Sequence, residues 1–227
     1  MPTEKFDPFV SEWASFSKNP NHNLIEKCLK LAQILEYPEV DISKYIQKIH
    51  ELGNSLKLKI GVGKSPTYLI SMLNEYLFEE CGFLGNEEDY YDPGNSFLNV
   101  VLDKKAGIPI TLSIIYSEVA KYIELDLQIV GFPGHIIVKY KDEIILDPFY
   151  HGRLLTIEDL EENLDRNFGE DVEFIPEYLN ESTTEQLLAR LLRNLKNAYT
   201  QSYAYDKAIR CADMILEIQP ESTEEIR

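Results

Sequence analysis

Positive charge, cysteine and long apolar runs are all scarce in this sequence of 227 residues. With 22 Lys and Arg against 39 Asp and Glu, its formal net charge is -17. Nucleic acids and anionic membranes are attracted by cationic surfaces, so this charge argues against both as partners. Neutral or positively charged proteins and peptides remain candidate partners. We interpret the acidic stretches at 158–173 and 217–225 as solvated surface.

The cysteines are too few and too scattered for a disulfide framework. Cys28, Cys81 and Cys211 lie in separate segments, and their number is odd, which is typical of a reducing compartment. The N-terminal residues carry no apolar core of a signal peptide, and no run approaches the roughly 20 apolar residues that span a bilayer. We therefore expect a cytoplasmic protein whose cysteines act as small buried hydrophobic residues.

Helical spacing dominates the first 83 residues. Apolar residues recur three and four positions apart, which predicts three amphipathic helices, with breaks at Pro38, at 61–66 and at 81–86. The predicted buried stripes are Leu24, Cys28, Leu31 and Ile34, then Tyr45, Ile46, Ile49 and Leu52, then Leu69, Met72, Leu73, Tyr76 and Leu77.

A long loop and two helices follow. Residues 86–96 are rich in turn formers, and their end offers an N-cap for a short helix through Leu102. The next helix has Pro109 in its first turn, where a missing N–H costs nothing. Its expected buried stripe is Leu112, Ile115, Tyr116, Val119, Ala120 and Ile123.

After Asp126 the pattern changes to short β-type runs at 127–132, 136–140 and 144–146, with an antiparallel turn at 141–143. Helical spacing returns at 156–164, with Thr156 as the N-cap, and again from Thr183 onward. The prediction is an α+β protein. It has a helical N-terminal half, a small antiparallel sheet packed on a central helix, and a C-terminal helix pair.

The last forty residues fit the 34-residue tetratricopeptide pattern if it starts at residue 189. The matching positions are Leu192, Leu195, Tyr199, Ala208 and Pro220. One such helix pair cannot bury its own apolar face, so it should lean on the preceding domain or on a further helix. We expect one domain at 1–180 and a tetratricopeptide-like segment at 181–227 that ends abruptly, as in a truncated chain. The oligomeric state is not indicated.

Candidate chemistry centres on His135 and on Asp147, twelve residues later. A hairpin loop with an odd number of residues around Asp142 places both side chains on one face, whereas an even loop separates them. A carboxylate beside an imidazole fixes its tautomer and favours its cationic form. The pair is either the orienting half of a catalytic triad or a structural hydrogen bond.

The third member of such a triad should stand at the start of a helix packed on the sheet, because the helix dipole lowers a thiol pKa there. The helix that opens at Pro109 presents Thr111 and Ser113 but no cysteine. Both hydroxyls are weak nucleophile candidates, and capping or packing is the simpler interpretation of each.

A nucleotide site is not expected, although residues 61–65 imitate a phosphate-binding loop. Leu58 stands where that motif needs glycine, and Pro66 removes an amide at the start of the following helix. No pattern of metal ligands is present, so we expect neither a metal nor a cofactor.

Several short segments together carry a resemblance. They are Leu73–Glu80, Gly82–Asn86, Asp89–Pro93, Asn95–Leu98, Gly107–Ser113, Pro133–His135 and Asp147–Arg153. The chain resembles the SirB-type regulators of the transglutaminase-like superfamily over roughly residues 25 to 220. This resemblance implies a papain-like cysteine, histidine and aspartate arrangement, with His135 and Asp147 in the last two places. The cysteine place maps near Pro109 to Thr111, where no sulfur is present.

Two functions follow from these expectations. The first is a regulatory module, a pseudoenzyme that recognises another protein or a peptide. Its candidate cleft residues are Tyr90, Tyr91, Asp92, Asn95, Pro109, Pro133, Gly134 and Phe149. The alternative is a hydrolase or acyl transferase on amide or ester bonds, which uses His135 and Asp147 with a hydroxyl or with water.

Overall fold

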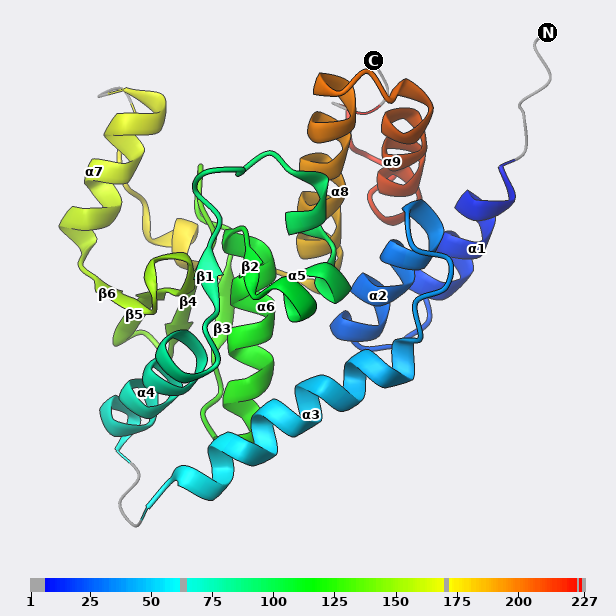
Figure 1. Cartoon of the computed structure of the whole chain (residues 1–227). Coiled ribbons are helices and arrows are strands. Elements are labelled where there is room, and N and C mark those ends of the chain that lie inside the picture. Colours follow the sequence, from blue (N-terminus) through cyan, green and yellow to red (C-terminus); the bar gives the residue numbers. More distant parts are fainter. Residues whose placement is uncertain (1–6, 62–64, 170–171, 224, 226–227) are drawn as a thin grey trace, which may run out of the picture.

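The computed structural model describes residues 7–61, 65–169, 172–223 and 225. The N-terminal half is helical, and α3 runs along one side of the molecule (Figure 1). Its elements are α1 (Pro8–Ser17), α2 (Leu24–Leu35), α3 (Ile42–Lys59), α4 (Pro66–Asn74) and a π-helical turn (Glu75–Glu80). The helix α3 includes Leu58, so the segment before the imitation phosphate loop is no strand. Residues 62–64 of that loop lie outside the described ranges.

The three predicted helices correspond to α2, α3 and α4, whereas α1 was not predicted. The fully buried Trp13 on α1 donates its indole N–H to the carbonyl oxygen of Met214, at 3.0 Å. Because this partner is 201 residues away, the stability of α1 depends on tertiary packing, which a local pattern does not reveal.

At the centre lies α6 (Pro109–Ala120), continued by a 3-10 turn (Lys121–Ile123). Pro109 opens the helix, as predicted. The six residues of the predicted stripe are buried, and burial extends beyond them, because Ile110, Thr111, Ser113 and Ile114 are buried as well. A helix that is apolar all round is a core helix. The helix contacts α3 as well as strands of the sheet, which accounts for its burial (Figure 1).

The short helix before it is α5 (Leu98–Lys104). The predicted N-cap was wrong, because Ser96 belongs to a 3-10 turn (Pro93–Ser96) and Phe97 holds the cap position without a side-chain bond. Asp92 explains the difference, since its carboxylate accepts the Gly94 N–H at 2.9 Å and starts that turn earlier.

The antiparallel sheet has the order β3-β4-β5-β6. Its strands are β3 (Gln128–Val130), β4 (Ile137–Tyr140), β5 (Ile144–Asp147) and β6 (Arg153–Leu155), and a two-residue parallel pair joins β1 (Leu84–Gly85) to β2 (Ala106–Gly107). Strand β6 was not predicted, since three residues carry no recognisable alternation. Side chains such as Val138 face the main core with α6, and Val130 and Ile137 face a smaller cluster with α7 (Ile157–Phe168). Thr156 and Asp159 cap α7 reciprocally, and Thr156 is the predicted N-cap.

The C-terminal helices α8 (Thr184–Gln201) and α9 (Tyr205–Ile218) pack side by side (Figure 1). Their apolar faces join the main core, where α9 meets α1, and α8 meets α2 and the Pro93–Ser96 turn. The pair therefore buries its apolar face against the rest of the chain, because a single helix pair cannot bury that face on its own. The division at 180/181 and the tetratricopeptide character stay predictions.

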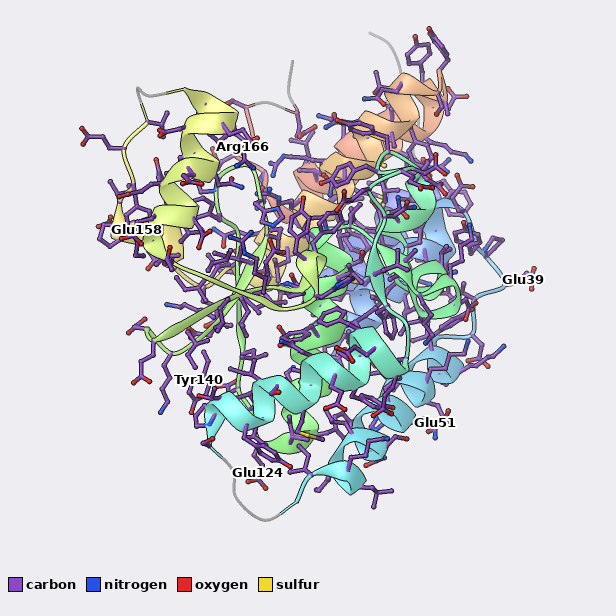
Figure 2. The ribbon with its side chains drawn as sticks, turned by 60° about the vertical axis from the view of Figure 1, so that its left-hand side comes forward. Glu39, Glu51, Glu124, Tyr140, Glu158 and Arg166 are labelled. Atoms are coloured by element: carbon purple, nitrogen blue, oxygen red, sulfur yellow. The ribbon has the colours of Figure 1, made fainter. Side chains whose placement is uncertain are left out.

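Many acidic side chains lie at the surface. Glu39, Glu51, Glu124 and Glu158 are exposed and project from the periphery (Figure 2). Glu225 differs from the predicted solvated stretch, because its side chain is 0% exposed and pairs with Arg193 and Lys196. Burial of a carboxylate is tolerated here because two cations compensate its charge. Within the described ranges, no helix combines the length and apolarity needed to cross a membrane.

Candidate functional site

The structure brings His135 and Asp147 into contact. The β4–β5 turn contains three residues, 141–143, and Val138 pairs with Leu146. Asp147 is therefore opposite Ile137, and His135 lies diagonally across from it on the same face. Nε2 of His135 is 2.7 Å from Oδ2 of Asp147. Their side chains are 15% and 5% exposed, so the bond is largely shielded from water while the ring keeps one accessible edge.

Local backbone structure holds both partners. Gly134, at φ +76°, makes the turn before His135, whose N–H donates to the carbonyl oxygen of Phe132 at 3.0 Å. Oδ1 of Asp147 accepts the Phe149 N–H at 3.0 Å and caps the 3-10 turn Pro148–Tyr150. One carboxylate oxygen is thus fixed by its own turn, and the other is left for the imidazole. A proton held on Nε2 by this carboxylate leaves Nδ1 as the basic nitrogen.

In the part of the chain that the structure describes, no nucleophilic side chain bonds to that nitrogen. Among the described residues, no hydroxyl or thiol forms a hydrogen bond with His135, and its ring instead contacts the ring of Phe149 edge-on, at 6.4 Å between centroids. This arrangement supplies an oriented base without a side chain for it to activate.

The two hydroxyl candidates lie in the core. Thr111 accepts the N–H of Ile108 at 3.2 Å and is within donor distance of the carbonyl oxygens of Asn95 (2.9 Å) and Ile108 (3.1 Å). Ser113 is fully buried, and its Oγ has no partner in the described part of the chain. Thr111 therefore acts as a helix-start cap, and neither hydroxyl bonds to the imidazole.

Aromatic rings form a continuous row beside His135, which we call the aromatic row and define as Tyr91, Tyr90, Phe149 and Tyr150. Successive centroids are 5.4, 6.0 and 5.1 Å apart. Tyr91, Tyr150 and Tyr90 are 66%, 51% and 40% exposed. Burial raises the pKa of Tyr90 and of Tyr150, which keeps both phenols neutral. Tyr150 was not among the predicted residues, although it directly follows Phe149.

The other five predicted cleft residues have structural roles. The Asn95 amide donates to the carbonyl oxygens of Asp89 (2.7 Å) and Tyr90 (3.2 Å) and so closes the 86–96 loop. Asp92 is exposed but caps the turn that follows it, and Pro109 is buried at the start of α6. Pro133 and Gly134 form the turn before His135.

The cysteines supply no substitute for the absent thiol. Burial raises the pKa of Cys28 and of Cys211 to about 12. Cys81 is half-buried at the end of the π-helical turn, and it makes no contact with His135 among the residues that the structure describes. Among the same residues, no three His, Cys, Asp or Glu side chains cluster in a way that could hold a metal ion.

Comparison with known proteins places this geometry in a family. A family model described as the transglutaminase-like superfamily matches residues 43–193, which include α6, His135 and Asp147. A UPF0162 protein of Xylella fastidiosa (strain 9a5c) is 34% identical over 198 residues, covering 85% of this chain and 70% of the relative. A UPF0162 protein of Vibrio cholerae is 28% identical over 154 residues, covering 66% of this chain and 57% of the relative.

A second kind of relative is F-box only protein 21 of Mus musculus, which is 31% identical over 147 residues. That match covers 57% of this chain and 23% of the relative. No solved structure gives a significant match. The family model and the Xylella relative together show that the chain belongs to the transglutaminase-like superfamily and, within it, to the UPF0162 family.

Proposed function

We propose that this chain is a regulatory, SirB-type module that binds a protein or peptide on a transglutaminase-like scaffold without a nucleophilic cysteine. The observation that carries the proposal is the exposed aromatic row beside His135, next to a helix start that offers no reactive group. The scaffold keeps its oriented imidazole, and the surrounding surface has the composition of a recognition site rather than a reaction centre.

Exposed tyrosines suit such a role. Tyr combines a large rigid ring with a polar hydroxyl, and Tyr and Trp are enriched among residues that dominate binding energy. The ring contacts of the aromatic row hold the side chains in place before a partner arrives, which lowers the entropy cost of binding. The net charge of -17 favours a neutral or basic partner over nucleic acid.

Two further observations support a module. The homologous region makes up 23% of the mouse relative named F-box only protein 21, so there it is one part of a longer chain. The α8–α9 pair, which we interpret as tetratricopeptide-like, adds a helical surface of the kind used in protein recognition. We place the module in the cytoplasm because its three cysteines are all free.

The test compares two variants. Tyr91→Ala with Tyr150→Ala removes the most exposed rings of the aromatic row, and Leu58→Ala removes an even more exposed apolar side chain on α3, outside the aromatic row and the α8–α9 pair. Quantitative affinity capture from extract of the source cells, followed by calorimetry with the purified partner, should show binding lost only in the first variant. Capture of the same proteins by both variants would reject the proposal.

A second candidate function rests on the 2.7 Å bond between His135 and Asp147. With Nε2–H held by the carboxylate, Nδ1 would accept a proton from a bound water as its oxygen attacks an ester or amide carbonyl. The imidazolium would then return that proton to the alcohol or amine that leaves when the bond to the carbonyl carbon breaks. Turnover of ester and amide probes should then be abolished by His135→Gln and retained by Thr111→Val and Ser113→Ala. A hydroxyl nucleophile would instead make one of the last two inactive.

A further inference from the structure

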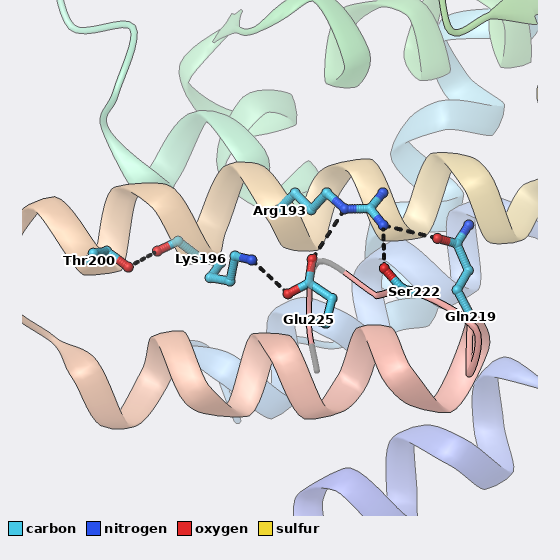
Figure 3. A network of polar contacts seen from close by, with 6 residues as sticks. All are labelled: Arg193, Lys196, Thr200, Gln219, Ser222 and Glu225. Carbon is cyan, nitrogen blue, oxygen red and sulfur yellow. Dashed lines mark hydrogen bonds and ion pairs between the residues drawn. The ribbon is translucent and has the colours of Figure 1, made fainter. Parts of the chain in front are cut away.

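Two arginines stand one turn apart on α8 and have different surroundings. Arg193 donates to Glu225 at 3.2 Å, to Gln219 at 3.1 Å and to Ser222 at 3.2 Å (Figure 3). Lys196 contacts the second oxygen of Glu225 at 2.6 Å. The charge of Arg193 is thus compensated within the C-terminal helix pair, and its role there is structural.

Arg190 lacks such compensation. Its guanidinium donates to the carbonyl oxygen of Phe132 at 3.4 Å, and in the described ranges no carboxylate pairs with it. The side chain is half-buried, and burial lowers its pKa, an effect that Tyr90 opposes and the neighbouring Arg193 reinforces. A cation withdrawn from water without a counter-charge is unfavourable, so an anion that reaches it gains more than it would at an exposed arginine.

Arg190 opens into a cavity of about 600 Å³. The cavity lies between the turn before His135, the segment 177–182 and α8, and its lining includes Pro133, Tyr178, Asn180, Ser182, Gln186 and Arg190. Several of these side chains can donate or accept hydrogen bonds around an arginine. This volume lies within the usual range for small-molecule and peptide-end sites.

The opposing charges at this cavity narrow the class of ligand. Glu177, Glu181 and Arg193 also line it. Glu181 accepts the Gln128 amide at 3.0 Å, and the charge of Arg193 is compensated by Glu225. Two carboxylates near one uncompensated guanidinium disfavour a doubly charged phosphate. They tolerate a single carboxylate, and they favour one carried by a ligand with an amino group. A guanidinium binds a planar carboxylate through two parallel hydrogen bonds.

We infer that this cavity binds the carboxylate end of a peptide, with Arg190 as its anchor. The inference rests on the proposed peptide-binding function and deepens it. Its anchor is Arg190 rather than a ring of the aromatic row, although Tyr90 of that row lies close enough to Arg190 to influence its charge, so variants at Arg190 and at Tyr91 and Tyr150 test the two proposals separately. Because Arg190 bonds to Phe132 and Pro133 lines the cavity, a seated carboxylate would lie against the same turn that carries His135.

The experiment uses a randomised tripeptide library with free C-terminal carboxylates and the same library with amidated C-termini. Saturation-transfer NMR with the full chain should show at least tenfold stronger binding of the free library. Arg190→Gln should abolish this preference, and Arg190→Lys should retain part of it. The matched control is Arg166→Gln, which removes an exposed arginine on α7 and should leave binding unchanged.

Several results would overturn the inference. These are equal binding of the amidated library, equal losses in Arg166→Gln and Arg190→Gln, or competition by inorganic phosphate that is stronger than competition by acetate. Thermal denaturation checks that Arg190→Gln folds, because its Tm should match the parent without peptide and should fail to rise when the free library is added. The Tyr91→Ala, Tyr150→Ala variant should still bind the free library. Loss of binding there would show that the two sites are one.

Discussion

The β4–β5 hairpin and the start of α6 are the two places where we predicted the members of a papain-like arrangement, and they differ in what their polar groups contact. At the hairpin, the Asp147 carboxylate bonds to the His135 ring, which keeps one edge accessible. At the helix start, Thr111 bonds to backbone atoms and is fully buried. The difference teaches that the hairpin holds an oriented imidazole near the surface, whereas the polar groups at the helix start are used within the core.

Packing around the helix start places Thr111 in the core. A Cβ built on Gly107 would lie 2.8 Å from Oγ1 of Thr111 and 2.9 Å from Cγ1 of Val101. The backbone of Gly107 therefore packs directly against the Thr111 side chain. A hydroxyl becomes nucleophilic only when a base can take its proton, and Thr111 directs its proton at carbonyl oxygens instead.

The largest effect that tests this comparison should come from the hairpin. Asp147→Ala leaves the Phe149 N–H and the imidazole without their acceptor in a shielded site, so we expect a loss of about 3 kcal/mol in the free energy of unfolding. Urea denaturation measures it. The control is Asp142→Ala, whose carboxylate is 95% exposed at the hairpin turn and should matter by less than about 0.5 kcal/mol. Equal losses would mean that the pair does not organise the hairpin.

The second-largest loss of stability should come from a substitution at the start of α6. Thr111→Val keeps the shape of the side chain but leaves the Ile108 N–H and the Asn95 carbonyl oxygen short of a partner, so we expect a loss of about 2 kcal/mol. The same denaturation experiment applies. If the hydroxyl served catalysis instead of capping, the variant would keep its stability and lose turnover of ester or amide probes.

A smaller effect should follow from the turn that carries His135. Gly134→Ala forces an L-residue to φ +76° and puts its Cβ about 3.0 Å from the Asn167 amide, so we expect a loss of about 1–2 kcal/mol. Gly82→Ala is the matched control, because Gly82 has φ +74° with open space around it. The difference between the two variants in urea measures the contact with Asn167. A larger loss in the control would show that the turn before His135 is not constrained.

Much of this architecture was predictable because its signals are local. The spacing of Leu24 to Ile34 indicates α2, the Thr156 cap starts α7, and Pro109 opens α6. The three-residue turn around Asp142 is also local, and it decides which face His135 shares with Asp147. Such features depend on residues a few positions apart, so a pattern reveals them.

The features that sequence reasoning missed depend on distant contacts. Helix α1 is fixed by the bond from Trp13 to Met214, and the Glu225 side chain, which lies beyond the end of α9, is buried against Arg193 and Lys196 of α8. The same limit hid Arg190, whose exceptional feature is the lack of a carboxylate beside it among the described residues. The absence of an ion-pair partner leaves no pattern in the sequence, whereas a helix cap or a periodic apolar stripe does.

The smallest expected effect isolates packing from function at the helix start. Ser113 lies two residues after Thr111, and its buried Oγ has no hydrogen-bond partner in the described part of the chain. Ser113→Ala removes an unsatisfied polar group, so the free energy of unfolding should stay within about 0.5 kcal/mol of the parent or rise by up to about 1 kcal/mol. Thr111→Val, measured beside it in urea, should show the opposite sign. A loss above about 1 kcal/mol in Ser113→Ala would mean that the hydroxyl has a hydrogen-bond partner. The start of α6 would then be held by a polar contact as well as by apolar packing. If stability rose while turnover of an ester probe disappeared, Ser113 would be a strained nucleophile and the pseudoenzyme proposal would fail.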